Sequence, residues 1–316
     1  MPVHSRIIEV PAGVDAGTQI PITTIEGAQP GPTLALIAGN HGYEYPPILA
    51  LQRLLTELDP AKLRGTVLVV HVANMPSFLG RTVYFSPVDG KNLNRVYPGR
   101  ADGTVSERIA YAITREVIEP CDALLDLHCG DGNESLRPYV YQCITGHADM
   151  DRRIARLVHA FGIEYAIADR GRPTDPAKSL YCSTTAITRG KPAVTVESGY
   201  LGTTNPICVT QICHGVFGVL RELGMIAEGP AALDEIVYFD PAEVLTSPET
   251  GILYPRVERD QRISKGDVIA HITDFFGKVI AEVQSPFDGI VLYVVATPPM
   301  VKGQPVACIG APRKSL

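Results

Sequence analysis

The sequence predicts an α/β protein: a mostly parallel (mixed) sheet flanked by helices, followed by a small all-β, barrel-sandwich-like C-terminal domain. Through about the first 225 residues, short apolar runs alternate with helical patterns. Runs without strict polar alternation suit strands buried on both faces, and strand–helix alternation suits a parallel sheet. Beyond a short acidic segment, strand-like stretches are separated by Gly and Pro every few residues.

Four apolar runs are the predicted strands of the first domain, at 33–38, 66–73, 123–128 and 193–197. Helical patterns lie between or after them. Leucines at 51, 54, 55 and 58 recur at helical spacing, and the prolines at 46 and 47 suit a helix start. Further helices are expected over 106–118, 149–161 and 214–223.

We therefore expect a catalytic domain over 1–226, a linker over 227–240 and a β-domain over 241–316. The β-domain contains an internal repeat. Ser247-Pro248 and Gly251-Ile252 recur 38 residues later, and Lys265-Gly266 recurs 37 residues later. Two interlocking half-repeats predict pseudo-two-fold symmetry.

Composition excludes several classes of function. The 316 residues carry 28 Lys+Arg against 34 Asp+Glu, a net charge of −6, so nothing favours nucleic acid or an anionic membrane. No apolar stretch approaches the ~18 residues of a membrane span, and the first residues lack the order of a signal peptide. Seven cysteines without a Cys-x-x-Cys motif predict free buried thiols and a cytoplasmic protein.

The candidate chemistry lies where predicted parallel strands end. His41 and Glu44 follow the first strand, and His128 ends the third. Ligands of open α/β sheets gather at the carboxyl ends of the strands. Two histidines and one glutamate form a catalytic zinc set that leaves a position for water. The sequence therefore predicts a metal site at His41, Glu44 and His128.

Other polar residues in the same region suit the rest of a hydrolytic site. Glu197 closes the fourth apolar run, where a carboxylate is costly to bury unless it is used, and it is our candidate general base and acid. Asn94 and Arg95 form a fork suited to a substrate carboxylate. Arg81, in the same loop, is either the group that polarises the scissile carbonyl or a solvated surface arginine.

These motifs resemble those of zinc carboxypeptidases, and most of all the succinylglutamate desuccinylase/aspartoacylase family. The matching phrases, over roughly residues 30–225, are Gly39-Asn40-His41-Gly42-Tyr43-Glu44, Asn92-Leu93-Asn94-Arg95, Asp126-Leu127-His128 and Thr195-Val196-Glu197-Ser198-Gly199. The resemblance implies a zinc-carboxypeptidase-like fold, one zinc per chain on His41, Glu44 and His128, and Glu197 as base. It also implies carboxylate recognition by Asn94 and Arg95, carbonyl polarisation by Arg81, and hydrolysis of N-acyl amino acids.

The two-domain form is similar to the N-acetyl-diaminobutyrate deacetylase branch of that family. Two positions depart from the family pattern. Asn92 stands where an Asp often orients a zinc-binding histidine, and Tyr43 stands where a small polar residue is common. Tyr43 either walls the pocket or packs. Asp126, two residues before His128 and on the same strand face, either orients that histidine or has a structural role.

The C-terminal domain resembles biotinyl/lipoyl barrel-sandwich domains through Ser285-Pro286-Phe287-Asp288-Gly289. Lys278 lies near the position of a carrier lysine but lacks the usual flanking residues. We expect the hairpin tip 274–278 to pack on the first domain and narrow access to the site.

Three functions therefore compete. The first is a zinc amidohydrolase acting on a small N-acyl amino acid. The second is a metallocarboxypeptidase acting on peptides or peptidoglycan stems. The third is a carrier or binding module that would use Lys278. The expected partner is a small-molecule substrate, and the sequence leaves open whether the chain forms a homo-oligomer.

Overall fold

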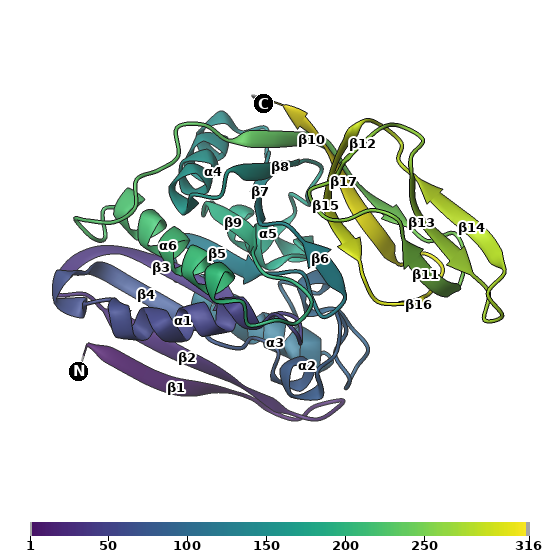
Figure 1. Ribbon diagram of the computed structural model, residues 1–316. Helices are drawn as coiled ribbons and strands as arrows, with labels where there is room; N and C mark the ends of the chain where they lie inside the picture. The colour runs from purple at the N-terminus through teal and green to yellow at the C-terminus, as the bar shows by residue number, and fades with distance from the viewer. Residues whose placement is uncertain (1, 314–316) are drawn as a thin grey trace.

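The computed structural model describes residues 2–313 of the chain (Figure 1). The strands of the first part are β1 (Val3–Val10), β2 (Thr18–Glu26), β3 (Gln29–Ala38), β4 (Arg64–Val70), β5 (Ala123–His128), β6 (Glu134–Leu136), β7 (Tyr139–Cys143), β8 (Tyr165–Asp169) and β9 (Ala193–Glu197). The α-helices are α1 (Tyr45–Glu57), α2 (Met75–Gly80), α3 (Val105–Ile113), α4 (Ala148–Phe161), α5 (Cys182–Ile187) and α6 (Pro206–Glu222). Short helical turns are η1 (Pro60–Lys62), η2 (Leu93–Arg95), η3 (Thr114–Ile118) and η4 (Pro176–Lys178).

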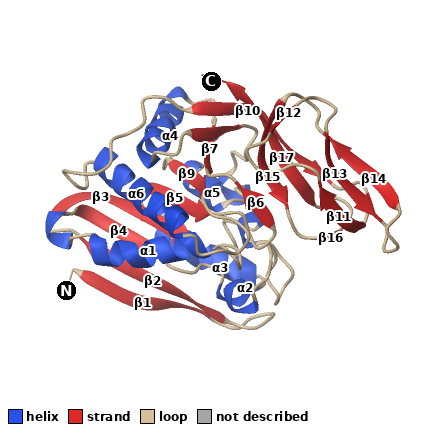
Figure 2. Cartoon of the chain, viewed as in Figure 1, coloured by secondary structure: helices blue, strands red, loops and turns tan. Residues whose placement is uncertain are grey.

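A mixed sheet organises the first part, and helices cover both of its faces (Figure 2). Its strand order begins β1-β2-β4-β3-β5-β9-β7-β8, and β4, β3, β5 and β9 are parallel to their neighbours within this set. Along β3, Leu34 and Leu36 pack with α1, α4 and α6, whereas Ala35 and Ile37 pack with α3 and α5. Burial on both faces explains why the second half of β3 is an uninterrupted apolar run.

The predicted strands correspond to β3, β4, β5 and β9, and the fold class is confirmed. Strand β4 ends at Val70, three residues before the predicted end. The helix expected over 214–223 begins earlier, at Pro206, because the Asn205 side chain accepts a hydrogen bond from the Ile207 amide (2.9 Å) and caps it. The part of the chain between Pro2 and Arg313 contains no helix with the length and apolarity needed to cross a membrane.

The C-terminal strands are β10 (Val237–Thr246), β11 (Gly251–Pro255), β12 (Arg262–Ile263), β13 (Val268–Thr273), β14 (Val279–Gln284), β15 (Gly289–Val295), β16 (Pro299–Met300) and β17 (Pro305–Arg313). Their pairing confirms the repeat. Gly251 in β11 pairs with Met300 in β16, and the equivalent Gly289 in β15 pairs with Ile263 in β12. Each half-repeat therefore pairs with a strand of the other half. The Oγ atoms of Ser247 and Ser285 each donate a 2.6 Å hydrogen bond to the carbonyl two residues on.

Two strand pairings join the first and second parts of the chain. Strand β10 continues the first sheet through Val237–Phe239, parallel to β8, and β6 pairs with β15. The last four residues of the expected linker, 237–240, therefore belong to β10.

The expectation for the hairpin tip is wrong. Phe275 and Phe276 at the tip are 73% and 97% exposed, and the tip between β13 and β14 lies away from the first part (Figure 1). The Asp274 side chain accepts hydrogen bonds from the amides of Phe276 and Lys278 (both 2.9 Å), which closes the turn within the hairpin itself.

Candidate metal centre

The carboxyl ends of β3, β5 and β9 lie side by side and carry the predicted site. In the register of β5 and β9, His128 stands opposite Glu197. After β3 the chain turns sharply at Gly39, whose φ of 73° favours glycine, and then reaches His41. Glu44 occupies the N-cap position of α1, which begins with Pro46 and Pro47 close to its start.

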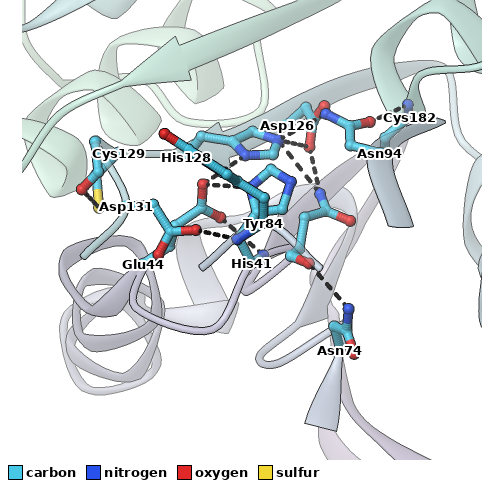
Figure 3. Close-up of polar contacts among 12 residues, drawn as sticks. His41, Glu44, Asn74, Tyr84, Asn94, Asp126, His128, Cys129, Asp131 and Cys182 are labelled. Carbon is cyan, nitrogen blue, oxygen red and sulfur yellow. Dashed lines mark hydrogen bonds and ion pairs between the residues drawn. The ribbon is translucent and has the colours of Figure 1, made fainter. Parts of the chain in front are cut away.

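The structure brings His41, Glu44 and His128 together (Figure 3). One potential ligand atom from each lies within 4.8 Å of the others, and the three residues are 9%, 2% and 2% exposed. Glu44 Oε1 lies 2.8 Å from His41 Nδ1 and 2.9 Å from His128 Nδ1. All three donors therefore converge on one small buried volume.

The Nε2 atoms of His41 and His128, which face away from Glu44 Oε1, each have a polar partner. His41 Nε2 lies 3.0 Å from Asn92 Oδ1, and His128 Nε2 lies 2.9 Å from Asp126 Oδ1. Because these oxygens accept hydrogen bonds from the Nε2–H groups, each Nδ1 keeps its lone pair for a metal. Asp126 thus contacts His128 as its strand position indicated, and Asn92 supports His41 through a neutral amide oxygen.

Burial and mutual charge shift the pKa values of this group. Burial by itself would lower the pKa of His128, but Asp126 and Glu44 raise it well above its ordinary value. Burial opposes ionisation of Glu44, yet the two histidines hold its pKa far below its ordinary value. In this cluster one carboxylate and two histidines share protons. The same groups can bind a divalent cation, which takes the place of those protons.

Glu197 lines the same cavity as His41 and Glu44. Its Oε2 atom is buried, and no group within residues 2–313 bonds to it. Burial raises the pKa of Glu197 well above its ordinary value, although the nearby His128 opposes the shift. A carboxyl group with an unsatisfied oxygen beside the triad is placed to exchange a proton with a ligand.

The other predicted residues divide into three positions. Arg95 lines the cavity, and its Nη1 atom donates to the Asn94 carbonyl (2.7 Å). The buried Asn94 side chain lies behind the site, with its amide nitrogen 3.2 Å from His128 Nε2 and its oxygen accepting from the Cys182 amide (2.8 Å). Arg81 is exposed, has a φ of 50°, and lines a neighbouring hollow with Tyr43 and Tyr45. The structure therefore does not bring Arg81 into the cavity of the triad.

The cavity, of about 430 Å³, also contains groups that sequence reasoning missed. Tyr84, Asp131 and Glu134 are among its lining residues. Asp131 and Glu134 follow His128 by three and six residues, and acidic residues just after a strand end were an available signal. The second part of the chain also lines the cavity, through Val244, Tyr293, Gly303, Gln304 and Pro305.

Tyr43, which the sequence left open between a pocket wall and packing, packs outside this cavity. A Cβ atom on Gly132 or Gly202 would come within 2.8 Å of its ring. The ring therefore fills the space that these two glycines leave.

The residues present fit a metal ion. The set supplies two imidazole nitrogens and one carboxylate oxygen, the donor set of catalytic zinc sites. The partners of both Nε2 atoms fix the tautomers that leave the Nδ1 atoms free.

The fold and this triad define an α/β protein with a candidate metal centre at the carboxyl ends of parallel strands. The family model for the succinylglutamate desuccinylase/aspartoacylase catalytic domain matches residues 30–223. The chain belongs to this family, as its motifs indicated.

Relatives and solved structures agree with this assignment. The chain is 34% identical to N-alpha-acetyl-L-2,4-diaminobutyric acid deacetylase of Halomonas elongata over 84% of this chain and 77% of that protein. A succinylglutamate desuccinylase structure from Silicibacter sp. TM1040 has a TM-score of 0.85 at 25% identity, covering 98% of this chain and 95% of that one. The product-bound ectoine utilization protein EutE (DoeB) of Ruegeria pomeroyi has a TM-score of 0.85 at 26% identity, with the same coverage.

Proposed function

We propose that the protein is a zinc-dependent amidohydrolase that deacylates a small N-acyl amino acid, with N-acetyl-diaminobutyrate as the leading candidate substrate. The observation that carries this proposal is the convergence of His41, Glu44 and His128 beside the unsatisfied carboxyl group of Glu197. The similarity to a deacetylase named for N-alpha-acetyl-diaminobutyric acid supports the choice of substrate.

His41, Glu44 and His128 would hold the zinc, which when bound activates water and polarises the substrate carbonyl. Glu197 takes a proton at its unsatisfied oxygen and returns it to the leaving amine. Arg95, at the cavity wall, pairs with the substrate carboxylate. Asn94 acts from behind the site, where its side-chain oxygen accepts a hydrogen bond from the Cys182 amide and holds the start of α5 in position.

Cavity size favours a small substrate over a peptide. The space of about 430 Å³ lies within the range of small-molecule sites, and residues 303–305 of the second part form one wall. A metallocarboxypeptidase would need an opening for a chain on this side. A carrier role would instead use the exposed Lys278, and intact mass of the purified protein tests for a group attached there. The buried free cysteines support the cytoplasm as the compartment.

The proposal is tested by metal analysis and by a screen of N-acetyl, N-succinyl and N-formyl amino acids with the product amines quantified. We expect about one zinc per chain and activity on an N-acetyl diamino acid. Glu197→Gln should keep its zinc and lower kcat by about 10²–10⁴-fold, because the proton acceptor is lost.

Glu249→Gln, at a half-exposed position in the second part, is the matched control and should behave as the parent. Loss of zinc from Glu197→Gln would make Glu197 a ligand, and near-parental turnover would contradict its role as base. An active protein without metal would contradict the zinc assignment.

A further inference from the structure

Once Arg95 is assigned to the substrate carboxylate, none of the predicted residues in the cavity is left to donate a hydrogen bond to the scissile carbonyl. When an amide is hydrolysed, its carbonyl oxygen gains negative charge, and a preorganised donor beside it lowers the barrier. Arg81 was the expected donor, but it is exposed and lines a different hollow. Among the described residues of the cavity, Tyr84 is the donor whose ring lies against a triad histidine.

Tyr84 stands edge-on to the His41 ring, with the ring centroids 6.2 Å apart and the planes at 90°. Its φ is 58°, a left-handed conformation that is unfavourable for a bulky side chain. Two contacts with residues that follow β5 hold Tyr84 in this conformation. The Tyr84 amide donates to Asp131 Oδ2 (2.7 Å), and its hydroxyl donates to Glu134 Oε1 (2.5 Å). Strained residues held in this way concentrate at functional sites.

We propose that the Tyr84 hydroxyl, supported by Glu134, is the donor that stabilises the oxygen of the scissile carbonyl in place of Arg81. The inference rests on the proposed amidohydrolase function. It makes Tyr84 a catalytic residue and Glu134 a positioning residue.

The hydrogen count of this pair is consistent with the role. The hydroxyl has one proton, so Glu134 must donate to the phenolic oxygen when that proton turns toward substrate. Burial raises the pKa of Glu134 to about 7, which keeps its acid form available near neutral pH.

The test compares Tyr84→Phe with two other variants of the zinc-loaded full chain. Tyr45→Phe makes the same chemical change in the neighbouring hollow and is the matched control. Arg81→Ala tests the competing assignment. Each variant is measured for kcat/KM on N-acetyl-diaminobutyrate, zinc content, and affinity for two ligands. One ligand is a phosphonamidate analogue of the substrate, whose tetrahedral phosphorus bears a negative oxygen, and the other is the product diaminobutyrate.

We expect Tyr84→Phe to lose about 10²–10³-fold in kcat/KM and a similar factor in analogue affinity. Product affinity and zinc content should stay within about twofold of the parent. Tyr45→Phe should match the parent, and Arg81→Ala should lose less than Tyr84→Phe. The double variant Tyr84→Phe/Glu134→Leu leaves no buried carboxyl group without a partner and should show the same selective loss.

A parental analogue affinity in Tyr84→Phe would overturn the proposal, and so would equal losses of analogue, product and zinc, which indicate a structural role. A larger loss in Arg81→Ala would return the role to Arg81. If the parent protein hydrolyses no N-acyl amino acid, the proposed function fails before Tyr84 is tested, so the two failures are distinguishable.

Discussion

Arg95 is held in place before any substrate arrives. Its guanidinium donates to the Asn94 carbonyl and lies over the Tyr181 ring, with Cζ 4.6 Å from the ring centroid. No acidic side chain within residues 2–313 forms an ion pair with it. A preorganised guanidinium that has no carboxylate partner in the protein is suited to bind the carboxylate group of a ligand.

Removal of the Arg95 charge should therefore raise KM only for substrates that carry a carboxylate. Arg95→Ala should raise KM at least about tenfold for an N-acetyl amino acid, because a charge-assisted hydrogen bond is lost. The C-terminally amidated analogue has no carboxylate, so its KM should change little. Steady-state kinetics on both substrates provide the measurement, and Arg100→Ala, an exposed arginine, is the control. Equal losses on both substrates would make Arg95 structural.

At the scale of elements, the turn between β3 and α1 sets the position of two of the three triad residues. Gly42 lies between His41 and Glu44, and the backbone of the α2 region packs directly against it. A Cβ atom at this position would lie 2.3 Å from the Ser77 carbonyl oxygen and 2.4 Å from that of Thr82. The turn can therefore lie against α2 only with glycine at position 42.

Gly42→Ala should displace this turn and weaken zinc binding by at least about tenfold, since ligands must be held close to their productive geometry. Competition with a chromophoric chelator measures the affinity. Gly80→Ala is the control, because the nearest atom to its new methyl group is a proline side-chain carbon at 3.1 Å. Zinc affinity unchanged in Gly42→Ala would show that the turn absorbs the clash.

The same elements show what sequence reasoning could reach. Strands β3 and β5 are buried on both faces, so their apolar runs, and the polar residues at their ends, could be predicted. The β1–β2 hairpin was missed because β1 contains no long apolar run: only Ile8 and Val10 are buried, and its other residues are exposed. Tyr84 could not be predicted, because its direction depends on a positive φ and on Asp131 and Glu134, about 50 residues away.

For the whole molecule, the second part of the chain is joined to the loop that carries Glu134. Strand β6 begins at Glu134 and pairs with β15, with Leu136 opposite Tyr293. Arg137 lies at this junction. Its amide donates to the Leu292 carbonyl (3.0 Å), and its guanidinium pairs with Asp260 (2.9 Å). The position of Glu134, and through it of Tyr84, thus depends on contacts between the two parts of the chain.

Arg137→Ala should loosen this junction without touching the triad. The side chain is 12% exposed and its guanidinium carbon lies 3.4 Å from the Tyr165 ring centroid, so its loss removes packing as well as charge. We expect the free energy of unfolding to fall by about 1–3 kcal/mol. The ion pair contributes little of this, because Asp260 is half exposed and solvent screens its charge. As β6 shifts, kcat/KM should fall by about tenfold while zinc content stays at the parental level. Thermal unfolding, kinetics and metal analysis measure the three effects.

Arg152→Ala, which removes an exposed pair with Asp149, is the control and should change none of them. Parental kinetics in an Arg137→Ala protein with a lowered Tm would show that the site does not depend on this junction.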